Sequence, residues 1–133
     1  MAYIHEHRII IADIRLDNLL LDDTLAINFC DFGESTSMPL EWDLHNTGEL
    51  GYLILADIGQ FGAVIYRIIT GCPRRDDLPS TEAVWLGLTI EDGWTLAFEC
   101  SKELAAALDQ VKPPEVSGQG GRLFREKILT TNL

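Results

Sequence analysis

The sequence has few cysteines, and their arrangement matches neither a disulfide framework nor a zinc site. Only three occur among 133 residues, at positions 30, 72 and 100. None belongs to a Cys-x-x-Cys pair, which is typical of zinc sites, and small disulfide-bonded domains carry an even number. Neither class of protein is supported. Cys30 lies in an apolar run and is predicted to be a small buried hydrophobic residue.

Long hydrophobic runs are also missing. A bilayer-spanning helix needs roughly 18 consecutive apolar residues. The longest candidate, residues 53–70, is interrupted by Asp57, Gln60 and Arg67. The first residues pass directly into a polar stretch, without the apolar core of a signal peptide. We therefore expect an intracellular protein, cytoplasmic or nuclear, that does not associate with membranes.

Positive charge is scarce. The 10 lysines and arginines are outnumbered by 21 aspartates and glutamates, which gives a formal net charge of −11. Nucleic acids and anionic membrane surfaces attract basic patches, so neither is an expected partner. The acidity is most simply a contribution to solubility, and basic partner peptides remain open.

The sequence has enough apolar residues to form one domain with a hydrophobic core, because 47% of the residues are hydrophobic. Residues 3–11 predict the end of a helix followed by an extended apolar segment. The apolar runs 19–21 and 26–30 flank a turn and predict a small β-hairpin whose first strand is buried. Residues 33–52 are rich in small and polar residues and predict a loop.

Helical spacing dominates the second half. Over residues 57–70 the apolar positions recur every three to four residues, which predicts a central, mostly buried helix. Asp57 is positioned to cap this helix and Gly71 to end it. A third helix is predicted over residues 80–92 and a fourth after Ser101. The expected fold class is α+β, predominantly helical.

Three polar residues stand at the edges of the strand-like segments. Asn18 follows Asp13 by five positions and precedes Asp31 by thirteen. A carboxylate and an amide that converge at one end of a hairpin offer the hard oxygen ligands that suit Mg²⁺. A further carboxylate nearby can accept the proton of a hydroxyl group, and Gly33 would let the chain turn sharply after the metal ligand. The alternative is that these residues only cap turns at strand ends.

Residues 9–33, IIIADIRLDNLLLDDTLAINFCDFG, resemble the catalytic loop, hairpin and metal-binding turn of protein kinases. The family pattern is His-Arg-Asp, four residues, Asn, and then Asp-Phe-Gly. Residues 56–71 resemble the central helix of the kinase C-terminal lobe, and Trp94 with residues 101–109 resembles its final helices. The loop is most similar to that of divergent fungal kinase-like proteins. The resemblance covers about residues 3–111.

The resemblance implies a role for each matched polar residue. Asp13 matches the aspartate that takes up the substrate hydroxyl proton, and Asn18 and Asp31 match the ligands of Mg²⁺ bound with ATP. Arg15 stands where the family has a basic residue near the transferred phosphate. Phe32 and Gly33 complete the cofactor-binding Asp-Phe-Gly turn.

The resemblance also implies a structural role for Asp57. It matches the aspartate that ties the central helix to the backbone of the catalytic loop. We expect Asp57 to hold that loop rather than to take part in chemistry.

Departures from the family pattern bear on activity. Ile11 and Ala12 replace His and Arg, and the segment between Asp31 and Asp57 is short for a kinase. No glycine-rich loop or strand lysine precedes the loop, so we expect an absent N-terminal lobe. Residues 1–111 are expected to form a truncated C-terminal lobe, and residues 112–133 a flexible C-terminal tail.

Three hypotheses about function follow from this pattern. The first is phosphoryl transfer from ATP to a protein hydroxyl, weak or absent in this chain by itself. The second is a pseudokinase-type module that binds a partner protein. The third is a degenerate kinase remnant.

Overall fold

The computed structural model describes residues 1–24, 26–41, 51–72 and 79–112, without the side chains of residues 51–53. Within these ranges the fold is α+β and predominantly helical, as predicted, with four α-helices, one short 3-10 turn and two sheets of two strands each. In chain order the elements are α1 (Ala2–Glu6), β1 (Ile9–Ile10), η1 (Leu16–Asn18), β2 (Leu19–Leu21), β3 (Ile27–Phe29), β4 (Thr36–Ser37), α2 (Gly51–Thr70), α3 (Gly87–Trp94) and α4 (Ser101–Gln110).

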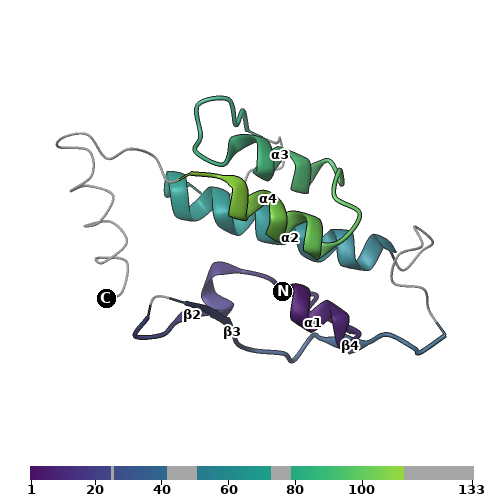
Figure 1. Ribbon diagram of the computed structural model, residues 1–133. Helices are drawn as coiled ribbons and strands as arrows, with labels where there is room; N and C mark the ends of the chain where they lie inside the picture. The colour runs from purple at the N-terminus through teal and green to yellow at the C-terminus, as the bar shows by residue number, and fades with distance from the viewer. Residues whose placement is uncertain (25, 42–50, 73–78, 113–133) are drawn as a thin grey trace.

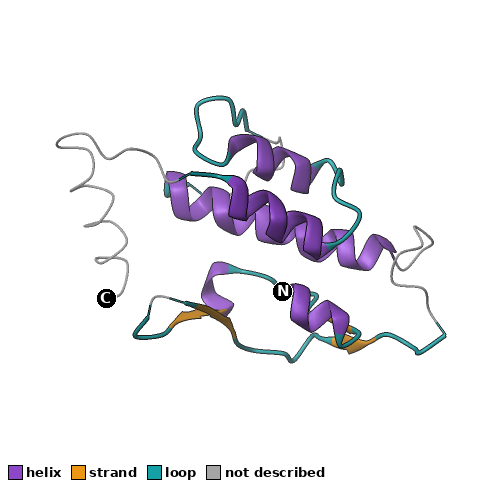
Figure 2. Cartoon of the chain, in the orientation of Figure 1, coloured by secondary structure: helices purple, strands orange, loops and turns teal. Residues whose placement is uncertain are grey.

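The arrangement has two parts, with α2 running between them (Figure 1). Helix α3 lies on one side of α2 and α1 with the short strands lies on the other, while α4 packs along α2 and also contacts α1 (Figure 2). The buried Ile58 side chain of α2 belongs to an apolar cluster with members from both parts, and Val64 belongs to one shared with the part that holds α1 and the strands. This placement agrees with the prediction of a central helix.

The bounds of α2 differ from the prediction at one end. The helix begins at Gly51, so Asp57 lies inside it and is no N-terminal cap. A fully buried aspartate within a helix needs hydrogen-bond partners outside that helix. The Asp57 carboxylate has them in the N–H groups of Ile11 and Ala12, in the loop after β1. The other end is as predicted, because Gly71 has a φ of +71° and its N–H bonds the Arg67 carbonyl.

Helices α2 and α3 approach closely through glycines. A Cβ at Gly62 would lie 3.4 Å from both the Ile90 carbonyl oxygen and the Trp94 ring. A Cβ at Gly93 would lie 3.5 Å from the Ile58 carbonyl oxygen. Gly93 lies within α3, where its missing side chain permits this contact.

Helix α3 begins later than the sequence predicts, at Gly87 instead of Ser80. The residue before it, Leu86, has a left-handed backbone with a φ of 66°, which prevents the helix from extending further toward its N-terminus. Gly87 packs against the Thr81 backbone, where a Cβ would lie only 2.1 Å from the carbonyl oxygen. The preceding segment therefore folds back onto the start of α3.

The predicted hairpin is present, with Leu19 opposite Phe29 and Leu21 opposite Ile27 in an antiparallel pair. Its first strand is not buried, which corrects the prediction: Leu20 is 58% exposed. The apolar run was interpreted as a buried strand, but only its first residue contacts a core cluster. Cys30, expected to be buried, is half-buried.

Residues 33–52 were predicted to form a loop, but part of this segment is a short β-strand. Thr36 and Ser37 form β4, which pairs antiparallel with β1. Helix α4 was predicted to start after Ser101, but it begins at Ser101 itself, because Cys100 occupies the cap position.

Two predictions fall partly outside the described residues: the flexible tail, at residues 113–133, and the loop, at residues 42–50. No helix within the described ranges has both the length and the apolar character needed to cross a bilayer.

Candidate functional site

The loop that carries Asp13, here called the Asp13 loop (residues 11–15), is attached to the middle of α2 by side-chain hydrogen bonds. Asp57 accepts two of them, from the N–H of Ile11 at 2.8 Å and from the N–H of Ala12 at 2.9 Å. Because Asp57 is fully buried, these bonds are shielded from competition with water. The prediction that Asp57 holds backbone amides of this loop is confirmed.

His5 extends the same network to two further helices. Its Nε2 lies 2.8 Å from an Asp57 carboxylate oxygen, and its Nδ1 forms a hydrogen bond with the Ser101 hydroxyl. All three side chains are buried. One histidine thus joins α1, α2 and the start of α4 beneath the Asp13 loop.

Gln60 is the second α2 side chain that contacts the Asp13 loop. Its Oε1 accepts the Ile14 N–H at 2.8 Å, and its Nε2 donates to the Ala12 carbonyl oxygen at 3.1 Å. Sequence reasoning missed both His5 and Gln60. The histidine belongs to no motif identified in the sequence, and the glutamine was interpreted only as an interruption of an apolar run.

Asp13 and Asn18 are in direct contact. The Asn18 side-chain amide donates to the Asp13 carboxylate at 3.0 Å and to the Asp13 backbone carbonyl at 3.1 Å. Asn18 is buried on η1, while the Asp13 side chain remains about one-third exposed. Asp13 is therefore held in one orientation yet reachable from solvent.

Arg15 lies beside this pair on the exposed side. Its Nε is 3.7 Å from an Asp13 carboxylate oxygen, and its Nη2 is 3.9 Å from Asp17. The guanidinium group is largely exposed, so these contacts are weak and the side chain can move to another anion.

Asp31 follows the hairpin strand that runs beside Asn18. The Cys30 N–H bonds the Asn18 backbone carbonyl at 2.9 Å, which brings the next residue, Asp31, to the same end of the hairpin. The left-handed backbone lies at Asp31, with a φ of 58°, whereas the sequence predicted the sharp turn at Gly33. The Gly33 N–H donates to the Asp31 carboxylate at 3.2 Å, and Phe32 is 45% exposed.

The donor set at this end of the hairpin is compatible with Mg²⁺. The Asn18 amide nitrogen is used toward Asp13, which leaves the Asn18 side-chain oxygen as the atom able to face a cation. Asp31 contributes an exposed carboxylate. These are hard oxygen donors, and Mg²⁺ commonly takes only one or two protein carboxylates together with phosphate oxygens. Among the described residues no group of three histidine, cysteine, aspartate or glutamate side chains forms a separate metal site.

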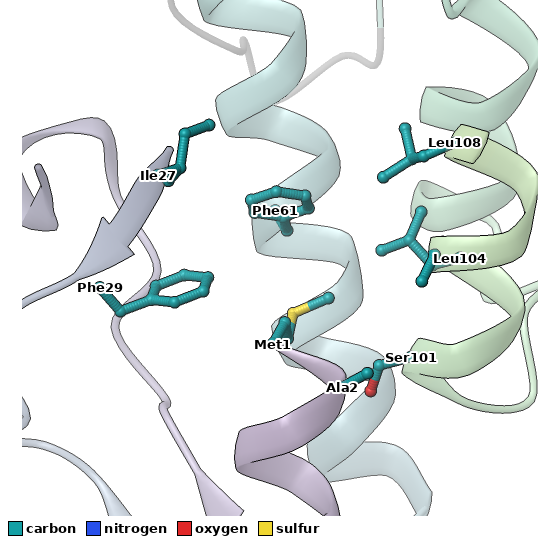
Figure 3. A pocket seen from close by; sticks show the side chains of 9 residues that line it. Met1, Ala2, Ile27, Phe29, Phe61, Ser101, Leu104 and Leu108 are labelled. Atoms are coloured by element: carbon teal, nitrogen blue, oxygen red, sulfur yellow. The ribbon is translucent and has the colours of Figure 1, made fainter. Parts of the chain in front are cut away.

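A separate apolar pocket of about 200 Å³ opens between the hairpin, α2 and α4 (Figure 3). Side chains from the hairpin, both helices and the first residues of α1 converge on it, namely Met1, Ile27, Phe29, Phe61, Leu104 and Leu108. It holds none of the polar residues discussed above except Ser101. It is therefore suited to an apolar side chain rather than to a phosphate or a metal ion.

Comparison with known proteins gives partial matches to protein kinases. The chain is 30% identical to the receptor-like cytosolic serine/threonine-protein kinase RBK2 of Arabidopsis thaliana over 103 residues, 64% of this chain and 22% of that protein. It is 31% identical to the serine/threonine-protein kinase polo of Drosophila melanogaster over 86 residues, 55% of this chain and 15% of that protein.

A longer but weaker match is to the serine/threonine-protein kinase PLK4 of Drosophila virilis, 26% identical over 126 residues, 84% of this chain and 16% of that protein. No family model matches the chain. These relatives come from a plant and from animals, so the resemblance to fungal kinase-like proteins stays a prediction. The chain thus spans about a fifth or less of the curated relatives it matches, and it contains a region similar to serine/threonine protein kinases.

Proposed function

We propose that this chain carries the catalytic loop and metal-binding turn of a protein kinase-like phosphotransferase, which moves the terminal phosphoryl group of ATP to a protein hydroxyl. The observation that carries the proposal is the hydrogen-bonded Asp13–Asn18 pair beside Asp31 at one end of the hairpin. Turn capping alone does not require Asn18 to be buried against an aspartate on the preceding loop.

Each residue has a distinct part in the proposed reaction. Asp13 accepts the proton of the substrate hydroxyl. At the same time the hydroxyl oxygen forms a bond to the terminal phosphorus, and the bond between that phosphorus and the ADP oxygen breaks. Asn18 and Asp31 would hold Mg²⁺, which would neutralise charge on the phosphate oxygens. Arg15 moves from Asp13 to the transferred phosphate, as its exposure allows.

The Asp-Phe-Gly turn supports the metal ligand in this proposal. The Gly33 N–H holds one oxygen of the Asp31 carboxylate, which limits its rotation. Phe32 presents an exposed ring that another part of a kinase-like domain or a bound nucleotide would cover. We expect the 133 residues by themselves to show little turnover, because positioning of ATP in such enzymes also needs a glycine-rich loop and a lysine.

The test is calorimetric titration of Mg²⁺ and ATP into the chain and into Asp31→Ala. We expect binding in the chain and loss in the variant. Asp23→Ala serves as the matched control, because Asp23 is an exposed aspartate in the turn of the same hairpin. Absence of binding in a chain that is folded by circular dichroism would overturn this function.

A protein-binding module is the second candidate, and the open apolar pocket favours it. The occupant we propose is a basic amphipathic helix of a partner protein. Its apolar face matches the pocket, and its charge matches the exposed acidic residues Glu103 and Asp109 on the helix that forms one wall. The net charge of −11 adds to this preference for a basic partner.

A pair of neighbouring alanines on α4 separates this candidate from general adhesion. Ala105 lines the pocket and Ala106 does not, and both are exposed. Ala105→Arg should abolish binding of a basic helical peptide, measured by fluorescence anisotropy, while Ala106→Arg should leave it nearly unchanged. Equal losses in both variants would indicate nonspecific charge attraction. Absence of peptide binding together with absence of ATP binding would leave the degenerate remnant.

A further inference from the structure

The two hydrogen bonds of Gln60 fall on either side of the proposed base. One goes to the Ile14 N–H and the other to the Ala12 carbonyl oxygen, so together they bracket Asp13. Within the Asp13 loop, Asp57 bonds the N–H groups of Ile11 and Ala12, both on the N-terminal side of Asp13. Among the described residues, Gln60 alone contacts the backbone on both sides of Asp13 with a side chain.

We propose that Gln60 is a positioning residue that sets the orientation of Asp13, an inference that rests on the function proposed above. The side chain acts through backbone groups and makes no contact with a reacting atom. Its position on the rigid central helix fixes the distance between Ala12 and Ile14, and thereby the direction in which the Asp13 side chain leaves the loop.

The backbone conformation at Ala12 explains why such a clamp is needed. Ala12 has a φ of 67°, a left-handed conformation that is unfavourable for an L-residue with a side chain. It persists because both backbone polar groups of Ala12 are bonded, the N–H to Asp57 and the carbonyl to Gln60. Removing the second bond would let the peptide between Ala12 and Asp13 rotate.

The chemistry of the side chain also fits this role. A carboxamide donates through its nitrogen and accepts through its oxygen, so it can satisfy an N–H and a carbonyl at once. Glutamate retains only the acceptor at neutral pH, and leucine retains neither group. These two substitutions therefore separate the contacts of Gln60.

The first measurement is backbone amide exchange followed by NMR on the whole chain. Gln60→Leu should speed exchange of the Ile14 amide by about tenfold or more, while the Ile11 amide, bonded to Asp57, keeps its protection. Gln60→Glu should leave Ile14 protected. Gln110→Leu is the matched control, because Gln110 is exposed at the end of α4. An unchanged Ile14 amide in Gln60→Leu would overturn the clamp.

The second measurement follows Asp13 itself through a spectroscopic signature. The Asn18 side-chain amide donates to Asp13, so its NMR resonances report the position of that carboxylate. Under conditions where both proteins are folded, Gln60→Leu should move these resonances toward those of a solvent-exposed amide, and Gln110→Leu should not. A freed Ile14 amide with unchanged Asn18 resonances would overturn the positioning role.

Neither NMR measurement uses ATP, which keeps the two proposals separable. Failure of the Mg²⁺–ATP titration with the clamp intact would remove the function and leave Gln60 as a purely structural residue. Binding of ATP with no response of Asn18 to Gln60→Leu would retain the function and reject the clamp.

Discussion

Ala12 provides a test of backbone strain at a single residue. Because its φ is 67°, Ala12→Gly should increase the free energy of unfolding by about 0.5–1 kcal/mol, as relief of strain exceeds the added flexibility of glycine. Ala105→Gly, the same substitution at an exposed site inside α4, should lower it by about 1 kcal/mol. Urea denaturation measures both. Loss of stability in both variants would contradict the strain at Ala12.

Some residues of the site can be identified from sequence patterns, and others cannot. Asp13, Asn18 and Asp31 stand at fixed spacings within a recognisable pattern, and Asp57 stands within another. His5 and Gln60 belong to no spacing pattern, and their partners lie 46 to 96 positions away along the chain. Contacts of that kind depend on how helices pack, which local patterns do not report.

Among the connecting segments, the turn before α3 depends most on one glycine. Gly87→Ala would force a Cβ to within 2.1 Å of the Thr81 carbonyl oxygen, so we expect a loss of about 3 kcal/mol or more in the free energy of unfolding. Gly71→Ala is the control, since that glycine is left-handed but has nothing within 4 Å of its Cβ position. Its cost should be only about 1–2 kcal/mol. Similar losses in the two variants would contradict the close contact at Thr81.

An ion pair joins α1 to α4 at the surface. Lys102 Nζ lies 2.7 Å from the Glu6 carboxylate, and this hydrogen bond with its charge lowers the pKa of Glu6 and raises the pKa of Lys102. The Glu6 contribution to stability is present above the ordinary glutamate pKa and is lost as pH falls through its lowered value. The Lys102 contribution is present below the ordinary lysine pKa and is lost as pH rises through its raised value.

The corresponding prediction concerns titration. Lys102→Met should return the pKa of Glu6 toward the ordinary glutamate range, measured by NMR titration of the Glu6 carboxyl group. Lys112→Met, at another exposed lysine, should leave it lowered. A Glu6 pKa that stays low in Lys102→Met would show that another group lowers it.

The predictability of whole elements followed the strength of their local signals. The hairpin and α2 carry clear periodicity and turn residues; the hairpin formed near the expected positions, and α2 ended where expected but began earlier. The predicted start of α3 was wrong because the left-handed backbone of Leu86 and the contact of Gly87 with Thr81 determine where this helix begins. The predicted burial of the first hairpin strand was wrong because apolar composition does not reveal which faces of a strand other elements cover.

At the scale of the whole molecule, the net charge of −11 implies repulsion among surface carboxylates. Salt at about 0.15 M screens charges more than about 8 Å apart, so the melting temperature should rise from low salt to this concentration. Calorimetric scans at neutral pH measure the change. A melting temperature that falls with added salt would indicate that favourable ion pairs dominate instead.

The attachment of the Asp13 loop to α2 has a consequence for biosynthesis. The bonds from Ile11, Ala12 and Ile14 reach 45 to 48 residues forward along the chain. During translation the ribosome releases the loop well before it releases Asp57 and Gln60. Since chains emerge at about 5–20 residues per second, the loop spends seconds without its partners. The geometry around Asp13 is thus completed only after α2 has left the ribosome.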